Sequence, residues 1–147
     1  MDMSFKEKSA WGLLLGILVV SAFFFPTAIG AVEFSESPWG LLRLSIVGVV
    51  ALVVIEVIYQ GVITGGSQRN SKSDERDELI DLKAERIASF SLGFSLIWIV
   101  VRIIATTGID AMIAPNVLMV AVWILAALTL SEIVKLASVI WHYRAGV

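Results

Sequence analysis

The chain contains no cysteine and only one histidine in its 147 residues. The missing thiols exclude disulfides, thiolate metal sites and a cysteine nucleophile. His142 has no second strong ligand near it in the sequence, and it lies in a C-terminal tail, 141–144, that we expect to be mobile. No Ser-His-Asp arrangement can be assembled around such a residue. We therefore expect a protein that is not an enzyme and that binds no metal or other cofactor.

Charge is scarce as well, at 16% of residues, whereas 58% of residues are hydrophobic. The net charge of -2 leaves no basic surface of the kind that binds nucleic acid, so we expect no nucleic-acid partner. A small soluble domain does not tolerate so much apolar sequence on its surface. The composition predicts an integral membrane protein with one transmembrane domain over residues 1–147.

Apolar runs occur four times, and each is long enough for the roughly 20 helical residues that cross a hydrocarbon core. The expected spans are 11–32, 39–63, 86–107 and 116–136. The first run is too long for the apolar part of a secretory signal, so we expect it to be retained. A polar connection and a charged helix fill residues 64–86. The predicted fold is all-α: a four-helix membrane bundle with a charged cytoplasmic extension of its third helix.

Nine of the eleven basic residues fall on one side of these spans, which is the cytoplasmic side in the usual distribution of lysine and arginine; the other two, Arg43 and Arg102, lie inside spans near their outer ends. The nine are Lys6, Lys8, Arg69, Lys72, Arg76, Lys83, Arg86, Lys135 and Arg144. The loops on the other side carry Glu33, Glu36 and Asp110. The pattern predicts a multi-pass protein of the cell membrane with both termini in the cytoplasm.

If the charged segment 74–86 forms a helix, most of its acidic and basic residues lie on opposite faces. One stripe is acidic and consists of Asp74, Glu78, Asp81 and Glu85. The opposite stripe is basic and apolar and consists of Arg76, Ile80, Lys83 and Ile87. One interpretation is a solvated helix beside the membrane whose Lys83 and Arg86 contact anionic head groups. The other is a docking surface for a basic partner or for a second protomer. These acids match no calcium-binding loop pattern.

The same segment resembles a motif, D-E-R-D-x-x-I-x-x-K-A-x-R-I-A, of small prokaryotic membrane proteins that are grouped as a domain of unknown function. The matching residues are Asp74, Glu75, Arg76, Asp77, Ile80, Lys83, Ala84, Arg86, Ile87 and Ala88. The resemblance implies a prokaryotic plasma-membrane protein with four spans, and it supplies no activity. Members of that family are often encoded near small helix-turn-helix regulators, which would imply a regulatory or sensing role.

Charged residues inside the spans are candidates for function because burying charge in lipid is costly. An inner ionic cluster is expected from Glu56, Arg86, Glu132 and Lys135. Arg43 and Arg102 lie near the outer boundary, level with Glu33, Glu36 or Asp110, with which they could form an outer ionic cluster. Contact with lipid phosphate is the favoured interpretation, and the two guanidiniums could also bind an anion together. For the inner cluster, structural pairing is favoured over a cation or proton site. The middle of the membrane carries no charge, which argues against coupled transport.

These patterns favour a protein that works by interaction, as a regulatory or accessory subunit or as a homo-oligomer. Segment 74–86 would be its cytoplasmic contact element, and membrane lipids with anionic head groups would be further partners. The alternative is a small oligomeric ion channel or transporter with Glu56 and Glu132 at its inner mouth. Its pathway would be lined by Ser45, Ser91, Ser95 or Thr129.

Overall fold

The fold was analysed in a computed structural model, which describes the backbone of residues 5–33, 75–109 and 117–145 and, between 39 and 61, of residues 39–40, 43, 46–51, 53–54, 57–58 and 61. Its helices are α1 (Phe5–Glu33), α3 (Glu75–Ile109) and α4 (Val117–Ala145). The described residues between 39 and 61 are also helical. All of the regular structure in the described part of the chain is therefore α-helix, as the sequence predicts.

Three helices among the described residues are long and apolar enough to cross a membrane, over Glu7–Val32, Asp77–Thr106 and Val117–Ala145. They indicate a membrane protein. Helix α3 has 35 residues and is about 52 Å long at 1.5 Å per residue. A hydrocarbon core is only about 30 Å thick, so close to 20 Å of α3 extends beyond it. The charged segment and the apolar segment of α3 thus form one uninterrupted helix.

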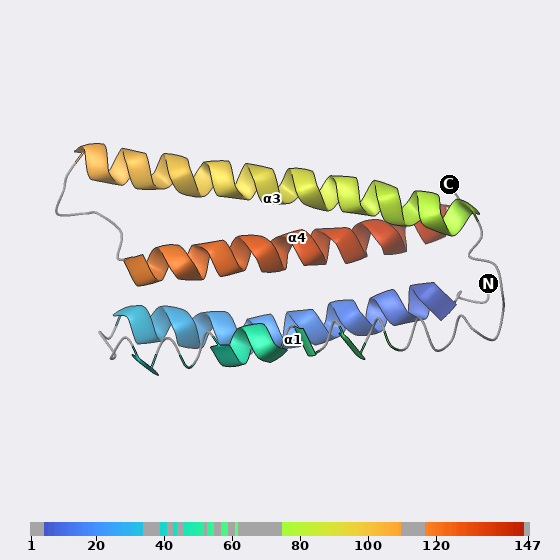
Figure 1. The fold of residues 1–147 in the computed structure, drawn as a ribbon, viewed down its shortest axis with the longest axis horizontal. Coiled ribbons are helices and arrows are strands. Elements are labelled where there is room, and N and C mark those ends of the chain that lie inside the picture. Colours follow the sequence, from blue (N-terminus) through green and yellow to red (C-terminus); the bar gives the residue numbers. More distant parts are fainter. Residues whose placement is uncertain are drawn as a thin grey trace.

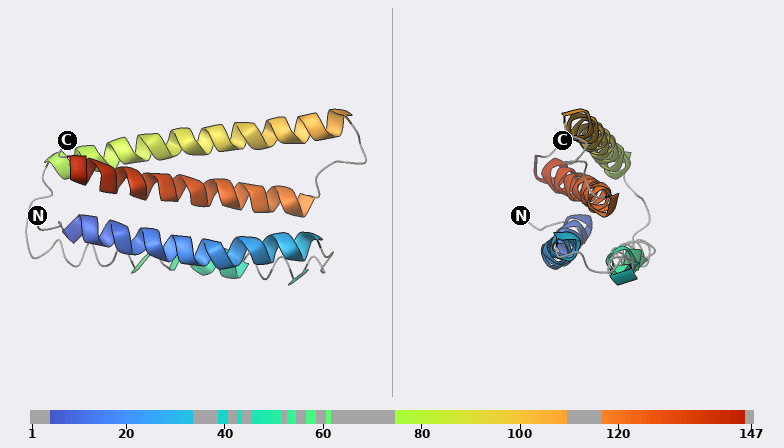
Figure 2. Two further views of the ribbon diagram at one scale, coloured as in Figure 1. Left: turned by 180° about the vertical axis from the view of Figure 1, so that it is seen from behind. Right: turned by 90° about the vertical axis from the view of Figure 1, so that its left-hand side faces the viewer.

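Helix α4 lies between α1 and α3 and packs against both (Figure 1). The view along the helices shows α3 on the side of α4 that faces away from α1, and the 39–61 segment beside α1 (Figure 2). Both termini lie at the end of the molecule where α3 begins (Figure 1). One broad face of α3 therefore has no neighbouring helix in the described part of the chain.

Two apolar clusters hold the helices together. The first lies near the termini and joins α1, α3 and α4 through Ala10, Leu13, Ile17, Ile80, Ala84, Leu136, Val139 and Ile140. The second joins α1 to α4 at the opposite end through Ala28, Ala31, Val32 and Val122. Each cluster contains two alanines, and such small side chains let helix backbones approach closely in membrane helix pairs.

The 39–61 segment approaches α1 at Gly48. A methyl group built on Gly48 would lie 2.5 Å from Cε2 of Phe24, which is closer than two carbon atoms can approach. Phe24 in turn packs on the second apolar cluster and contacts Phe25 edge to face, with ring centroids 5.2 Å apart. Only a residue without a side chain fits here while Phe24 keeps its position.

The Gly48→Ala variant is expected to lower the free energy of unfolding by about 1–3 kcal/mol, because the added methyl group forces the Phe24 ring to move. The matched control is Gly93→Ala, because nothing lies within 4 Å of a methyl group there. The control should leave stability unchanged or raise it slightly, since alanine favours helix over glycine. Thermal unfolding in mild detergent measures both. Equal melting temperatures for the two variants would contradict the close approach at Gly48.

Helix α4 runs to Ala145, nine residues beyond the end that we predicted at 136. The expectation of a mobile tail at 141–144 is therefore wrong. His142, Tyr143 and Arg144 belong to the last turns of α4, where each makes a side-chain contact. The error arose because we ended the span where the hydrocarbon would end, although a helix continues beyond the membrane when its polar end finds partners.

Candidate functional site

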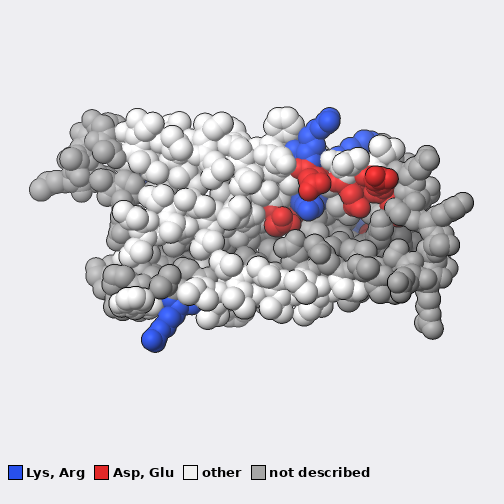
Figure 3. Space-filling view, viewed as in Figure 1, with Lys and Arg blue, Asp and Glu red and all other residues white. Residues whose placement is uncertain are grey.

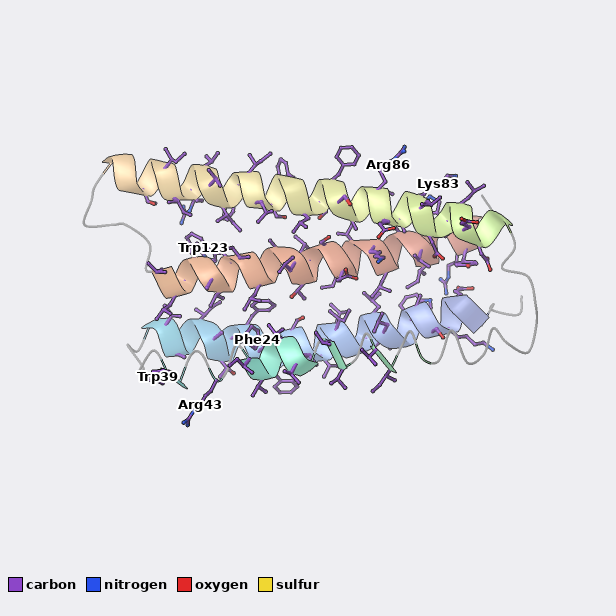
Figure 4. The ribbon with its side chains drawn as sticks, in the orientation of Figure 1. Phe24, Trp39, Arg43, Lys83, Arg86 and Trp123 are labelled. Atoms are coloured by element: carbon purple, nitrogen blue, oxygen red, sulfur yellow. The ribbon has the colours of Figure 1, made fainter. Side chains whose placement is uncertain are left out.

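The acidic stripe of α3 is exposed. Glu78, Asp81 and Glu85 all lie at the surface of the helix, whereas Asp74 lies outside the described residues. Lys83 and Arg86 are exposed as well, and Arg86 points away from α4 (Figure 4). Arg76 belongs to α3, but its side chain is not among those described. The described members of the predicted docking surface are therefore accessible to a partner.

The opposite side of α3 is fixed to the other helices. Ile80 and Ala84 are 1% and 0% exposed, and they pack into the first apolar cluster. The hydroxyl of Tyr143 donates a hydrogen bond of 2.7 Å to Oδ1 of Asp77, which ties the start of α3 to the end of α4. Ser131 donates a buried hydrogen bond of 2.9 Å to the carbonyl oxygen of Ala88. These contacts hold the acidic stripe outward in a defined orientation.

A hollow of about 570 Å³ continues this outward surface toward the apolar part of α3. It is lined by Leu82, Glu85, Arg86, Ser89 and Phe90. The hollow combines apolar side chains with one acidic and one basic group. Charged side chains on this face of the molecule gather over the same end, apart from one cation near the other end (Figure 3).

A second polar group, which sequence reasoning missed, lies where both termini meet. Nε of Arg144 donates to Oε1 of Glu7 at 3.2 Å, joining the last turn of α4 to the first turns of α1. The Glu7 side chain is 9% exposed and that of Arg144 is 61% exposed. The guanidinium also stacks over the ring of Trp11, 5.5 Å from its centroid. Glu7, Trp11 and Arg144 are called the terminal lock below.

The sequence contained one sign of the terminal lock. Glu7 is an acidic residue between Lys6 and Lys8, just before the first span, but we did not predict from the sequence that it pairs with Arg144 at the other end of the chain. Local patterns could not make this connection, because the two residues are 137 positions apart. Their contact depends on α1 and α4 lying antiparallel with their ends level.

His142 is held inside its own helix. Its Nδ1 lies 2.7 Å from the carbonyl oxygen of Ser138 and 3.3 Å from the Ser138 hydroxyl. Within the described residues, no group of three or more histidine, aspartate or glutamate side chains gathers around a point where a metal ion would fit. The arrangement around His142 is a local helix contact.

The predicted inner cluster is distributed over different faces. Glu132 lines a cavity of about 160 Å³ with residues of α1 and the 39–61 segment, including Leu13, Ile17 and Val49. Arg86 lies on the outward side of α3, and Lys135 is half-buried on α4. In the part of the chain that the structure describes, no ion pair joins Glu132 to Arg86 or Lys135. Glu56 lies outside the described residues, so an ionic cluster around it stays a prediction.

Arg43 and Arg102 are not brought together. Arg43 points away from the helices (Figure 4). The guanidinium carbon of Arg102 instead lies 5.9 Å from the ring centroids of both Trp98 and Trp123. These two rings meet edge to face across α3 and α4 with centroids 6.4 Å apart. The structure does not place a shared anion site between the two arginines.

Residues proposed to line a channel also fall into separate places. Ser95 lines a cavity of about 380 Å³ between α3 and α4, and Thr129 lines the 160 Å³ cavity beside α1. Both hydroxyls donate to backbone carbonyls one turn earlier, of Ser91 and Leu125. Ser45 lies outside the described residues. A single chain thus offers no common polar pathway among its described residues.

Comparisons of the chain with family models, with curated proteins and with solved structures found no match. The resemblance of residues 74–88 to small prokaryotic membrane proteins accordingly stays an expectation. Function has to be inferred from the exposed stripe, the hollow beside it and the contacts that orient them.

Proposed function

We propose that this chain is a plasma-membrane protein that works by interaction, as a regulatory or accessory subunit or as a homo-oligomer. The outward face of α3 between residues 78 and 90 is its contact surface. Both termini lie in the cytoplasm in this proposal, which puts the charged end of α3 there too. The single observation that carries the proposal is that α3 is fixed on one side, whereas no described helix covers its other side.

The uncovered side of α3 offers two kinds of contact. Glu78 and Glu85 lie seven residues apart on one face, which is two helical turns, so a basic segment can bridge them. Beyond them, Leu82 and Phe90 are 57% and 73% exposed beside the hollow. Charge complementarity would select the partner and set the rate of association. The apolar side chains would supply most of the affinity through burial.

A second copy of the chain has the chemistry that this face requires. Lys83 and Arg86 flank the acidic stripe on the same exposed helix. Two copies of α3 can therefore pair the acids of one with the cations of the other, which is how a self-complementary interface with twofold symmetry is built. A different membrane protein with a basic juxtamembrane segment meets the same requirement.

Reversing the two acids, with Glu78→Lys and Glu85→Lys together, is expected to abolish the specific complex. Four units of charge change at the contact surface, while the buried face of α3 keeps all of its residues. Native mass spectrometry of the protein extracted gently from its own membrane measures the mass and composition of the complex. A heteromeric mass identifies an accessory subunit, and a multiple of 16.0 kDa identifies a homo-oligomer.

The control is Lys8→Glu, which reverses an exposed charge on α1 at the same end of the molecule. It should leave the complex unchanged. In a homo-oligomer, adding Lys83→Glu and Arg86→Glu to the double variant should restore assembly, because the charge pattern is then inverted on both copies. A complex that survives the double reversal with its composition intact would rule out this surface.

A further inference from the structure

The 380 Å³ cavity between α3 and α4 lies in the half of these helices that is farther from the termini. It is lined by Phe94, Ser95, Trp98, Ile99, Trp123, Ala126, Ala127 and Leu130. Nearly all of these side chains are apolar, and the volume lies in the range of small-molecule sites. The cavity opens between two apolar helices, so it faces the lipid when the helices cross a membrane.

Arg102 stands at one end of this cavity. Its guanidinium lies against Trp98 and Trp123, which are both lining residues, at 5.9 Å from each ring centroid. Aromatic rings attract the cation, but they do not accept its five N–H groups in the guanidinium plane. Among the described residues no carboxylate and no hydrogen-bond acceptor contacts this side chain. The cation is therefore held in place with its donors available to an anion.

The length of the cavity along the helix axis matches that of a hydrocarbon chain in one half of the membrane. From Arg102 to Phe94 is eight residues of helix, or about 12 Å along the axis. Half of a hydrocarbon core is about 15 Å thick. A chain that enters beside Arg102 thus runs along the cavity toward the middle of the membrane without leaving the apolar part of either helix.

We propose that this cavity binds one anionic phospholipid, with its phosphate on Arg102 and an acyl chain along the groove between Trp98 and Leu130. Charge complementarity selects an anionic head group, and the apolar lining selects a lipid over a free anion. The site requires that the helices cross a membrane, as proposed above. It does not use Glu78 or Glu85.

The test is native mass spectrometry of the purified protein in detergent, after mixing with equal amounts of phosphatidylglycerol and phosphatidylcholine. The wild type should retain one phosphatidylglycerol. Arg102→Gln should lower the ratio of phosphatidylglycerol to phosphatidylcholine retained by roughly tenfold, because a charge-assisted contact is lost. Arg43→Gln is the matched control and should change nothing, since Arg43 lies outside the cavity. Equal ratios for the two arginine variants would overturn the proposal.

Two further measurements separate a seated lipid from a surface charge effect. Ala126→Leu fills the cavity while it leaves Arg102 in place, and it should prevent retention of either lipid. In the unaltered protein, brominated phosphatidylglycerol should quench tryptophan fluorescence more strongly than brominated phosphatidylcholine at the same fraction. Retention that survives Ala126→Leu, or equal quenching by the two brominated lipids, would contradict an acyl chain beside Trp98 and Trp123.

Two controls distinguish a lipid site from a site for a free anion and from the contact surface on α3. Glycerol phosphate, which has the charged group without the acyl chains, should not displace the lipid, and displacement would show a free-anion site in place of a lipid site. The Glu78→Lys and Glu85→Lys variant should retain the lipid even when its complex is lost. Loss of the lipid in that variant would overturn the separation of the two surfaces.

Discussion

Replacing Ile80 by alanine is expected to lower the free energy of unfolding by about 2–5 kcal/mol, which is the range for removing a large buried aliphatic side chain. Ile80 is 1% exposed, and it lies where α1, α3 and α4 converge. Its neighbours include Ala84 and Ala10, which are 0% exposed and too small to close the resulting cavity. The effect is large because Ile80 lies in the part of α3 that extends beyond the hydrocarbon core in our proposal. Water is the alternative environment there, so burial stabilises fully.

The matched control is Leu82→Ala. Leu82 is 57% exposed two residues further along the same helix, so in the chain dissociated from any partner its replacement should change stability by no more than about 0.5 kcal/mol. Unfolding in mixtures of mild and denaturing detergent, followed by circular dichroism, measures both variants. Similar losses for Ile80→Ala and Leu82→Ala would mean that α3 is not anchored through its Ile80 face. Because the chain has no cysteine, Ala84→Cys introduces a single thiol, and its protection from maleimide labelling reports the same docking of α3.

The sequence predicted the helical fold well because the apolar runs are long and uninterrupted. The 35-residue α3 joins the charged segment to the apolar one, as the stripe pattern of 74–86 indicated. The exposure of Glu78, Asp81 and Glu85 also agrees with that pattern. Periodicity identifies such a stripe because the helix itself sets which residues share a face.

The packing partners could not be predicted in the same way. The stripe pattern grouped Ile80 with Lys83 and Ile87, but the structure buries Ile80 with Ala84 and leaves Lys83 and Ile87 exposed. Alanine carries little signal in a hydrophobic pattern, although it decides where helix backbones approach. The depth of a charged residue in the membrane likewise does not determine which way its side chain points. Arg43 and Arg102 were expected to act together because their depths are similar. The contacts of Arg102 depend on which helix faces α3.

The terminal lock gives the second large effect: Arg144→Ala is expected to lower the free energy of unfolding by about 1–3 kcal/mol. An ordinary exposed ion pair contributes only about 0–1 kcal/mol, and Arg144 is 61% exposed, so the direct attraction is screened by solvent. The larger part of the effect comes from Glu7, which is 9% exposed and would lose a charged partner while it stays buried. The contact of the guanidinium with Trp11 is lost as well.

A double-mutant cycle with Glu7→Gln separates these contributions. The two losses should not add, because removing the carboxylate also removes the group whose contact Arg144→Ala breaks. A coupling of about 0.5–3 kcal/mol is expected for residues in direct contact. Arg144→Lys should recover only part of the stability, since lysine keeps the charge but not the planar group that stacks on Trp11. Lys8→Ala, which removes an exposed cation one residue from Glu7, is the control and should have little effect. Strictly additive losses would show that Glu7 and Arg144 act independently, and that α1 and α4 are joined at this end by their apolar cluster alone.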